Sequence, residues 1–169
     1  MAYYPTENRL GLSNFTTIDT TPAYAFGTLV RGFDSVLGGG GEFIYLLGVA
    51  SNIVGAMVTY NEVTGVTTLS PAGTTAKGFP LAVSMTANTT TTSGSWYQIS
   101  GTAVIKKTAV KCNPSVAIFL SGTQGRFFPT ATSGRQILNA VTNNSATVAS
   151  ATSTVNVLIQ RPFCQGQVV

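Results

Sequence analysis

Apolar and polar residues alternate with a period of two along much of the chain, the pattern of β-strands that bury one face. In residues 79–87, for example, Leu81, Val83 and Met85 alternate with small or polar residues. Turn-forming segments separate such stretches at intervals of roughly 8–12 residues, which is typical of β-sandwiches and barrels. We therefore predict about nine short strands, at residues 27–34, 42–50, 55–60, 65–69, 79–87, 95–105, 116–121, 125–130 and 153–162.

This pattern predicts an all-β fold, a compact β-sandwich or barrel-like domain over residues 24–169. Residues 1–23 show no sustained period, so we predict an extended N-terminal arm, with or without short strands. The apolar side chains of the arm pack either on its own domain or on a neighbouring protein, and the sequence leaves both open. Residues 136–151 are rich in Asn, Thr and Ser, which are poor helix formers, and we interpret them as a loop or a short helix.

The longest predicted strand carries two more specific expectations. Trp96 and Tyr97 are neighbours in a strand, so their side chains point to opposite faces of the sheet. One of them belongs to the core, and the other lies at an interface, binds sugar by stacking or is ordinary amphipathic surface. Phe127 and Phe128 raise the same question on a shorter strand. Gly101 is typical of a β-bulge.

The composition narrows the class of function. Only 8% of the residues are charged, 44% are hydrophobic, and there are 26 threonines, 18 glycines and no histidine. A chain this apolar is not a solvated disordered segment. We expect a surface of uncharged polar residues, much of it lying against other proteins.

The charges are segregated along the sequence. Residues 1–62 hold five acids and two bases, a net charge of −3, whereas residues 63–169 hold seven bases and no acid. Either a basic face meets an acidic partner, or strands of both segments intermix in the fold and the asymmetry disappears. Only Lys106, Lys107 and Lys111 cluster, which is too sparse for nucleic-acid binding, so we expect no nucleic-acid partner.

The residues offer little for catalysis, and we predict no enzyme. Without histidine, acid–base chemistry would need a carboxylate pair. Glu42 and Glu62 are the candidates, but both are read more simply as charges at strand ends. The glycines at 38–41 lack the lysine and the following helix of a phosphate loop, so we expect a turn and no cofactor.

Three further features concern location and cysteine chemistry. No apolar run is long enough to span a membrane, so we expect no membrane partner. The N-terminus lacks the basic and apolar regions of a signal peptide, which predicts synthesis in a cytoplasm. Cys112 and Cys164 are the two cysteines. We expect buried thiols, with a disulfide between them as the alternative and no zinc or other metal site.

Several stretches of the sequence resemble a family of small proteins encoded among tailed-phage head genes. The resemblance covers residues 27–105 well and the last third loosely. Its motifs are a GEF-Y-GVAS stretch, a VTYN strand, a G-P-AV-M-AN segment, a WYQI-G-AV strand and a closing RP-F. Here these are Gly41–Ser51, Val58–Asn61, Gly78–Asn88, Trp96–Val104 and Arg161–Phe163.

The resemblance implies a capsid decoration (cement) protein, assembled in the host cytoplasm and located on the outer capsid surface of the virion. Such a protein binds the major capsid protein at capsomer junctions, stabilises the shell and forms a homo-oligomer, a trimer rather than a dimer. A head-appended or fibre-type carbohydrate-binding module and a tail-tube protein are the alternatives. The arm and the basic residues supply our candidate interface: Tyr3, Tyr4, Arg9, Leu10, Leu12, Phe15, Lys106, Lys107, Lys111 and Arg126.

Overall fold

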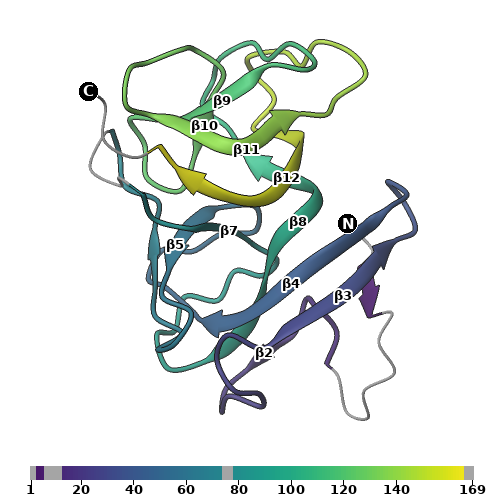
Figure 1. The fold of residues 1–169 in the computed structure, drawn as a ribbon, viewed down its shortest axis with the longest axis vertical. Coiled ribbons are helices and arrows are strands. Elements are labelled where there is room, and N and C mark those ends of the chain that lie inside the picture. The colour runs from purple at the N-terminus through teal and green to yellow at the C-terminus, as the bar shows by residue number, and fades with distance from the viewer. Residues whose placement is uncertain (1–2, 6–12, 74–77, 166–169) are drawn as a thin grey trace.

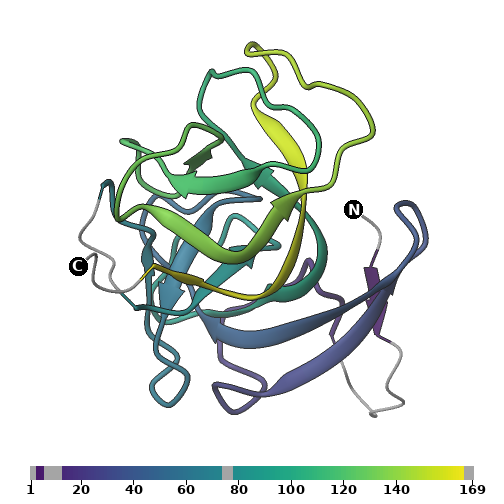
Figure 2. The same cartoon turned by 45° about the horizontal axis from the view of Figure 1, so that its top comes forward.

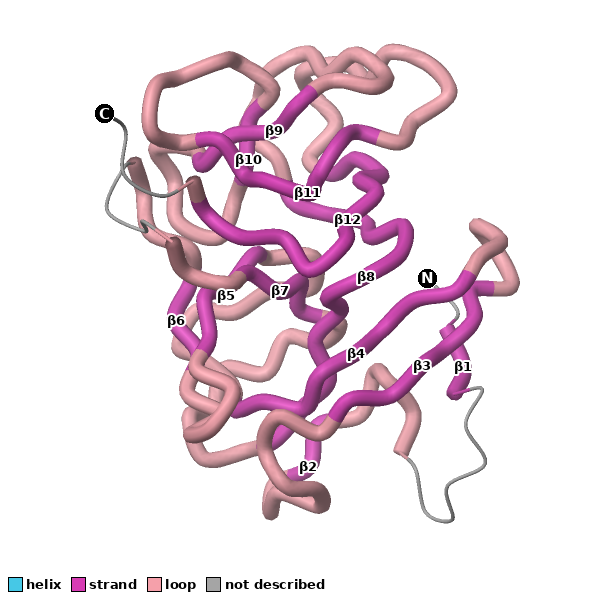
Figure 3. The backbone as a smooth tube through the Cα atoms, in the orientation of Figure 1, coloured by secondary structure: helices cyan, strands magenta, loops and turns pink. Residues whose placement is uncertain are grey.

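The computed structural model describes residues 3–5, 13–73 and 78–165, and within them the regular structure is all strand. The predicted all-β class is therefore confirmed, and each of the nine predicted strands overlaps an observed one (Figures 1 and 3). The strands are β1 (Tyr3–Pro5), β2 (Ile18–Asp19), β3 (Leu29–Asp34), β4 (Gly40–Leu47), β5 (Met57–Tyr60), β6 (Thr67–Leu69), β7 (Leu81–Ser84), β8 (Gly94–Lys106), β9 (Ala117–Leu120), β10 (Phe127–Phe128), β11 (Gln136–Thr142) and β12 (Thr154–Cys164).

These strands form one curled antiparallel sheet in the order β1-β3-β4-β8-β12-β11-β9-β10, with β5, β6 and β7 branching from β8. The long β8 is the hub, because it pairs with β2, β4, β7 and β12. The far edge bends back towards β8 through a bridge between Lys107 and Phe127. In Figure 2 the strands β8 to β12 curl into a barrel-like half, while the β3–β4 hairpin projects away from it.

The prediction for residues 136–151 is wrong over its first half. Residues Gln136–Thr142 form β11, which lies between β12 and β9. The strand is irregular, which makes it hard to recognise from the sequence. Asn139 has a φ of +57°, and the pairing with both neighbouring strands shifts there. Hydrogen bonding from two adjacent strands therefore determines the conformation, against a weak local preference.

The core consists of three apolar clusters. The largest fills the barrel-like half with side chains such as Ile105, Phe127 and Val157. Trp96 belongs to a second cluster and Tyr97 to a third, which confirms that they point to opposite faces of β8. Both rings are fully buried, so the expectation that one of them reaches the surface is wrong. The third cluster is formed by β4, β5, β7 and β8, with β8 paired to both β4 and β7 (Figure 1).

The bulge of β8 lies near the predicted position. Glu42 pairs with Ser100 and Phe43 with Gln98, so Ile99 has no counterpart in β4. Gly101 itself has a φ of +97°, and a Cβ atom there would come within 2.5 Å of the carbonyl oxygen of Gly40. A glycine is thus required at this position, because the backbone of β4 approaches β8 too closely for a side chain.

The described part of the predicted arm packs on its own domain. Ile18 and Asp19 pair with the start of β8, and the carboxylate of Asp19 accepts a 2.6 Å hydrogen bond from the Tyr45 hydroxyl. The indole N–H of Trp96 donates to the Ser13 hydroxyl, 3.2 Å away. Residues 13–23 are therefore integrated with the β domain, which settles for them the alternative that the sequence left open.

Candidate interaction surface

A hollow lies between the β3–β4 hairpin and the last part of β12. We call it the hairpin groove. It has a volume of about 470 Å³. Four of its residues are register neighbours across four strands, since Arg31 pairs with Glu42, Glu42 with Ser100, and Ser100 with Gln160. Its lining consists of Arg31, Gly32, Phe33, Gly40, Gly41, Glu42, Ser100, Gln160 and Arg161.

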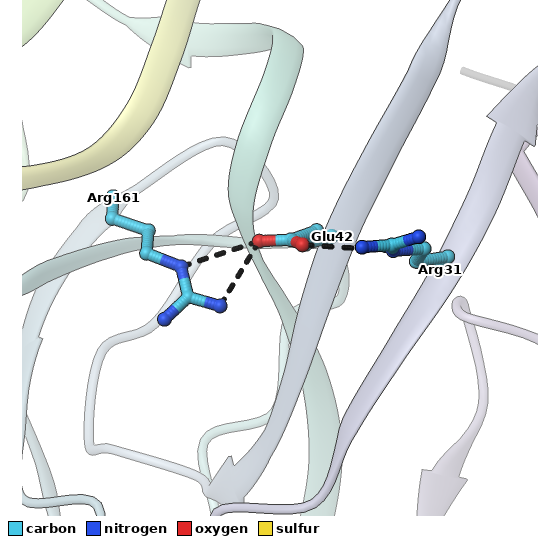
Figure 4. A network of polar contacts seen from close by, with 3 residues as sticks. All are labelled: Arg31, Glu42 and Arg161. Carbon is cyan, nitrogen blue, oxygen red and sulfur yellow. Dashed lines mark hydrogen bonds and ion pairs between the residues drawn. The ribbon is translucent and has the colours of Figure 1, made fainter.

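Glu42 lies between two arginines in this groove (Figure 4). The Nε and Nη2 atoms of Arg161 each donate a 3.2 Å hydrogen bond to its Oε2 atom. The Nε atom of Arg31 lies 3.7 Å from Oε1, an ion pair without a hydrogen bond. Both arginines are largely exposed, at 73% and 62% of their side-chain surface, whereas Glu42 is 28% exposed.

The backbone explains how residues 119 positions apart meet here. Arg31 is placed by the β3–β4 register, and its outward direction follows from the alternation along β3, in which Leu29, Arg31 and Phe33 are exposed. Arg161 follows the last residue of β12 that pairs with β8, and its φ is +48°. That left-handed conformation is uncommon outside glycine, and it marks the point where β12 leaves β8.

The turn of the hairpin presents two apolar side chains to solvent. Asp34 is buried, and its Oδ1 atom accepts hydrogen bonds from the amides of Val36 and Leu37, at 2.7 and 3.0 Å. Gly38 and Gly39 complete the turn with φ values of +68° and +125°. This turn orders the tip, yet Val36 is 72% and Leu37 38% exposed. Gly38 and Gly39 thus form the predicted turn, whereas Gly40 and Gly41 already belong to β4.

Exposed apolar surface continues on both sides of the groove. Phe33 is 44% exposed on the hairpin side. On the barrel side, Leu158 is 37% exposed and lines a second hollow that shares Gln160 with the hairpin groove. Aromatic and arginine side chains around a partly apolar depression are the composition typical of protein interfaces.

The structure disperses the predicted N-terminal interface residues. The backbones of Tyr3 and Tyr4 pair with the end of β3, beside the hairpin groove. Arg9, Leu10 and Leu12 lie outside the described residues. The prediction that Phe15 is an interface residue is wrong. Its side chain is fully buried among Phe43 and Trp96, so it presents no surface to a partner.

The predicted basic cluster also separates. Lys111 is exposed, Lys106 is partly exposed, and Arg126 donates a 3.3 Å hydrogen bond to the carbonyl of Lys107. The prediction that Lys107 is an interface residue is also wrong, because its side chain is fully buried. Its ammonium group donates to backbone carbonyls of Thr108, Val110, Ala149 and Ser150, at 3.4, 2.8, 3.0 and 3.3 Å.

The two halves of the charge pattern meet at Glu42. This acid belongs to the acidic N-terminal stretch, yet one of its partners is Arg161 from the basic stretch. At this point the strands intermix, as one of the two readings of the sequence expects. Even so, the groove retains two bases for one acid.

The described residues considered for catalysis, metal binding or sugar stacking do not come together in one site. Glu62 is exposed in the turn between β5 and β6 and does not line the groove of Glu42. Within residues 3–5, 13–73 and 78–165, no three metal-ligating side chains gather. Of the aromatic residues considered for sugar stacking, Trp96, Tyr97 and Phe127 are fully buried. Phe128 is partly buried, with its ring 6.4 Å from that of Phe119.

Cys112 and Cys164 are free and buried in the largest core cluster, as expected from the sequence. Burial raises the pKa of the Cys164 thiol to about 12. It also raises the pKa of Cys112, with the charge of Lys107 opposing that effect. Both groups are thiols rather than thiolates near neutral pH.

The sequence analysis missed the groove residues Arg31 and Arg161. The outward position of Arg31 was readable from the alternation in Leu29–Asp34. Nothing local indicates that Arg161 reaches Glu42, because their meeting depends on the path of β12 after Gln160.

Comparisons with known proteins add no relative. No family model matches the chain, and neither does any curated protein or solved structure. The described part of the chain also contains no helix long and apolar enough to cross a membrane.

Proposed function

We propose that this protein is a structural component of a phage-like particle that binds the outer surface of the icosahedral shell and stabilises it. The observation that carries the proposal is the projecting β3–β4 hairpin. Its ordered turn presents Val36 and Leu37 to solvent, and its base forms the groove with Phe33 and two arginines. A rigid apolar tip beside a hydrogen-bonding depression supports a role in protein–protein contact.

The stabilising effect follows from interface area. A protein that bridges neighbouring capsomers adds contacts that must be lost before the shell opens. Each contact can be modest if several copies act together, because a linked second contact forms at high effective concentration. The low charge content suits such a role, since few charges lose their hydration when the surface is buried. In this proposal the partner is the major capsid protein, and the chain forms a trimer.

Electron microscopy of the native particle tests the class of function. We expect density for this chain on the outer shell lattice, at junctions between capsomers. Density confined to the tail would support a tail-tube role instead and overturn the proposal. The absence of the chain from the particle would overturn both.

A second experiment tests stabilisation and oligomeric state. Shells stripped of the protein should open at lower temperature than shells to which it has been added back, as measured by the release of a DNA-binding dye. Native mass spectrometry of the free protein should give three copies. An unchanged opening temperature would contradict the stabilising role, whatever the number of copies.

A further inference from the structure

Among the residues that the structure describes, the contacts within the hairpin groove leave several donors of the two arginines without a partner. Each guanidinium group carries five N–H donors. The contacts to Glu42 engage Nε and Nη2 of Arg161 and, at ion-pair distance only, Nε of Arg31. The two side chains are mostly exposed, so a further carboxylate can approach them without rearrangement of the backbone.

The charge of the groove discriminates between possible occupants. Two arginines face one glutamate, so the local charge is positive. A second copy docked groove to groove about a twofold axis would place the arginines of both copies together. That arrangement opposes like charges, whereas an acidic residue on another protein would be attracted. The groove therefore favours an acidic partner over self-association through this face.

The apolar lining supports the same occupant. Phe33 lies on the same exposed side of β3 as Arg31, and Ser100 and Gln160 add uncharged polar groups. A carboxylate in this hollow would be partly shielded from water by the Phe33 ring. Shielding strengthens the ion pairs, because the local dielectric falls.

We propose that the hairpin groove receives an aspartate or glutamate side chain of the shell protein, which binds Arg31 and Arg161 in competition with Glu42. This inference rests on the proposed function, since it names the chemistry of the shell at the point of contact. In the free protein, Glu42 then binds the two arginines in the way that the partner's carboxylate does in the complex. Glu42 positions the two arginine side chains in the free protein. When the shell is bound, the partner's carboxylate replaces Glu42 in some of these hydrogen bonds.

The test is a binding titration of stripped shells with the folded chain and its charge variants. We expect Arg31→Gln and Arg161→Gln each to weaken binding by about 3- to 10-fold, with a shallower dependence on salt. Glu42→Gln should tighten binding by about 3-fold, because the competitor loses its charge. Arg135→Gln is the matched control, since it makes the same substitution at a partly exposed arginine that does not line the groove.

The outcomes separate the inference from the function on which it rests. If wild-type protein binds the shells but the two arginine variants behave like Arg135→Gln, the carboxylate contact is wrong and the shell-binding function stands. If Glu42→Gln weakens binding, Glu42 does not compete with the partner's carboxylate, and the inference is overturned. If the wild-type protein does not bind shells at all, the proposed function and this inference both fail. Urea unfolding of each variant confirms that it remains folded.

Discussion

The ring of Phe15 stacks on the ring of Phe43, with centroids 4.0 Å apart and planes inclined by 17°. The contact joins a segment that precedes the first long strand to the centre of β4. Trp96 meets the edge of Phe15 at a centroid distance of 5.7 Å, which completes a buried aromatic cluster. A residue expected in an arm is therefore part of the core.

Phe15→Ala should lower the free energy of unfolding by about 3–5 kcal/mol, because it removes a fully buried ring and leaves a cavity against Phe43 and Trp96. Urea denaturation measures the change. Ile18→Ala is the control from the same segment. Ile18 is 42% exposed, and its truncation should cost less than about 1 kcal/mol. Equal effects of the two substitutions would mean that the segment is not packed as described.

Lys107→Met should destabilise the fold by about 2–4 kcal/mol, because buried carbonyls lose their charged donor. The affected groups join two loops, since Val110 precedes β9 and Ala149 precedes β12. Thermal unfolding measures the change, and Lys111→Met, at an exposed position, should leave the transition almost unmoved. A neutral result for Lys107→Met would show that water replaces the ammonium group.

The two buried thiols should resist labelling by a disulfide reagent at pH 8 in the native state. Burial raises the pKa of both, to about 12 for Cys164, so little thiolate forms in the folded chain. Both should react within minutes once the protein is unfolded in urea. Rapid reaction of either thiol without denaturant would contradict the burial.

The same thiols predict how stability depends on pH. The folded pKa of Cys164 is raised above the unfolded value of about 8.5, so above that pH the unfolded chain loses a proton that the folded chain keeps. The contribution of the thiols to stability should therefore be complete below about pH 8. For Cys164 it should fall as the pH rises from about 8.5 towards the folded pKa of about 12, by at most about 1.4 kcal/mol per pH unit. Cys164→Ala should make this decline shallower, and an unchanged decline would assign it to other groups.

Replacing both Val36 and Leu37 with Asp should weaken binding to stripped shells by at least about 10-fold, because the apolar tip would carry charge. The melting temperature should change little, since both side chains are exposed. Val63→Asp is the control, at a position 88% exposed in the turn between β5 and β6. Equal losses in tip and control variants would place the shell contact elsewhere.

Much of the fold was readable from local patterns. The alternation in segments such as Leu81–Ser84, with turn-forming residues between them, was sufficient for nine strands and the all-β class. The irregular β11 escaped prediction, and β1 and β2 were expected only as short strands somewhere in the arm. Their sequences lack a clear period, and they are strands because a neighbour supplies hydrogen bonds.

The sequence by itself determined the strand periodicity, the opposite orientation of Trp96 and Tyr97, and the turn at the glycine stretch, because these depend on neighbouring residues in the chain. The tertiary structure alone decided that Phe15 and Lys107 are buried and that Arg161 reaches Glu42. Burial and ion pairing depend on which distant strands lie side by side. That arrangement is set by sheet order and by the path of β12 beyond β8, which no local pattern in the chain encodes.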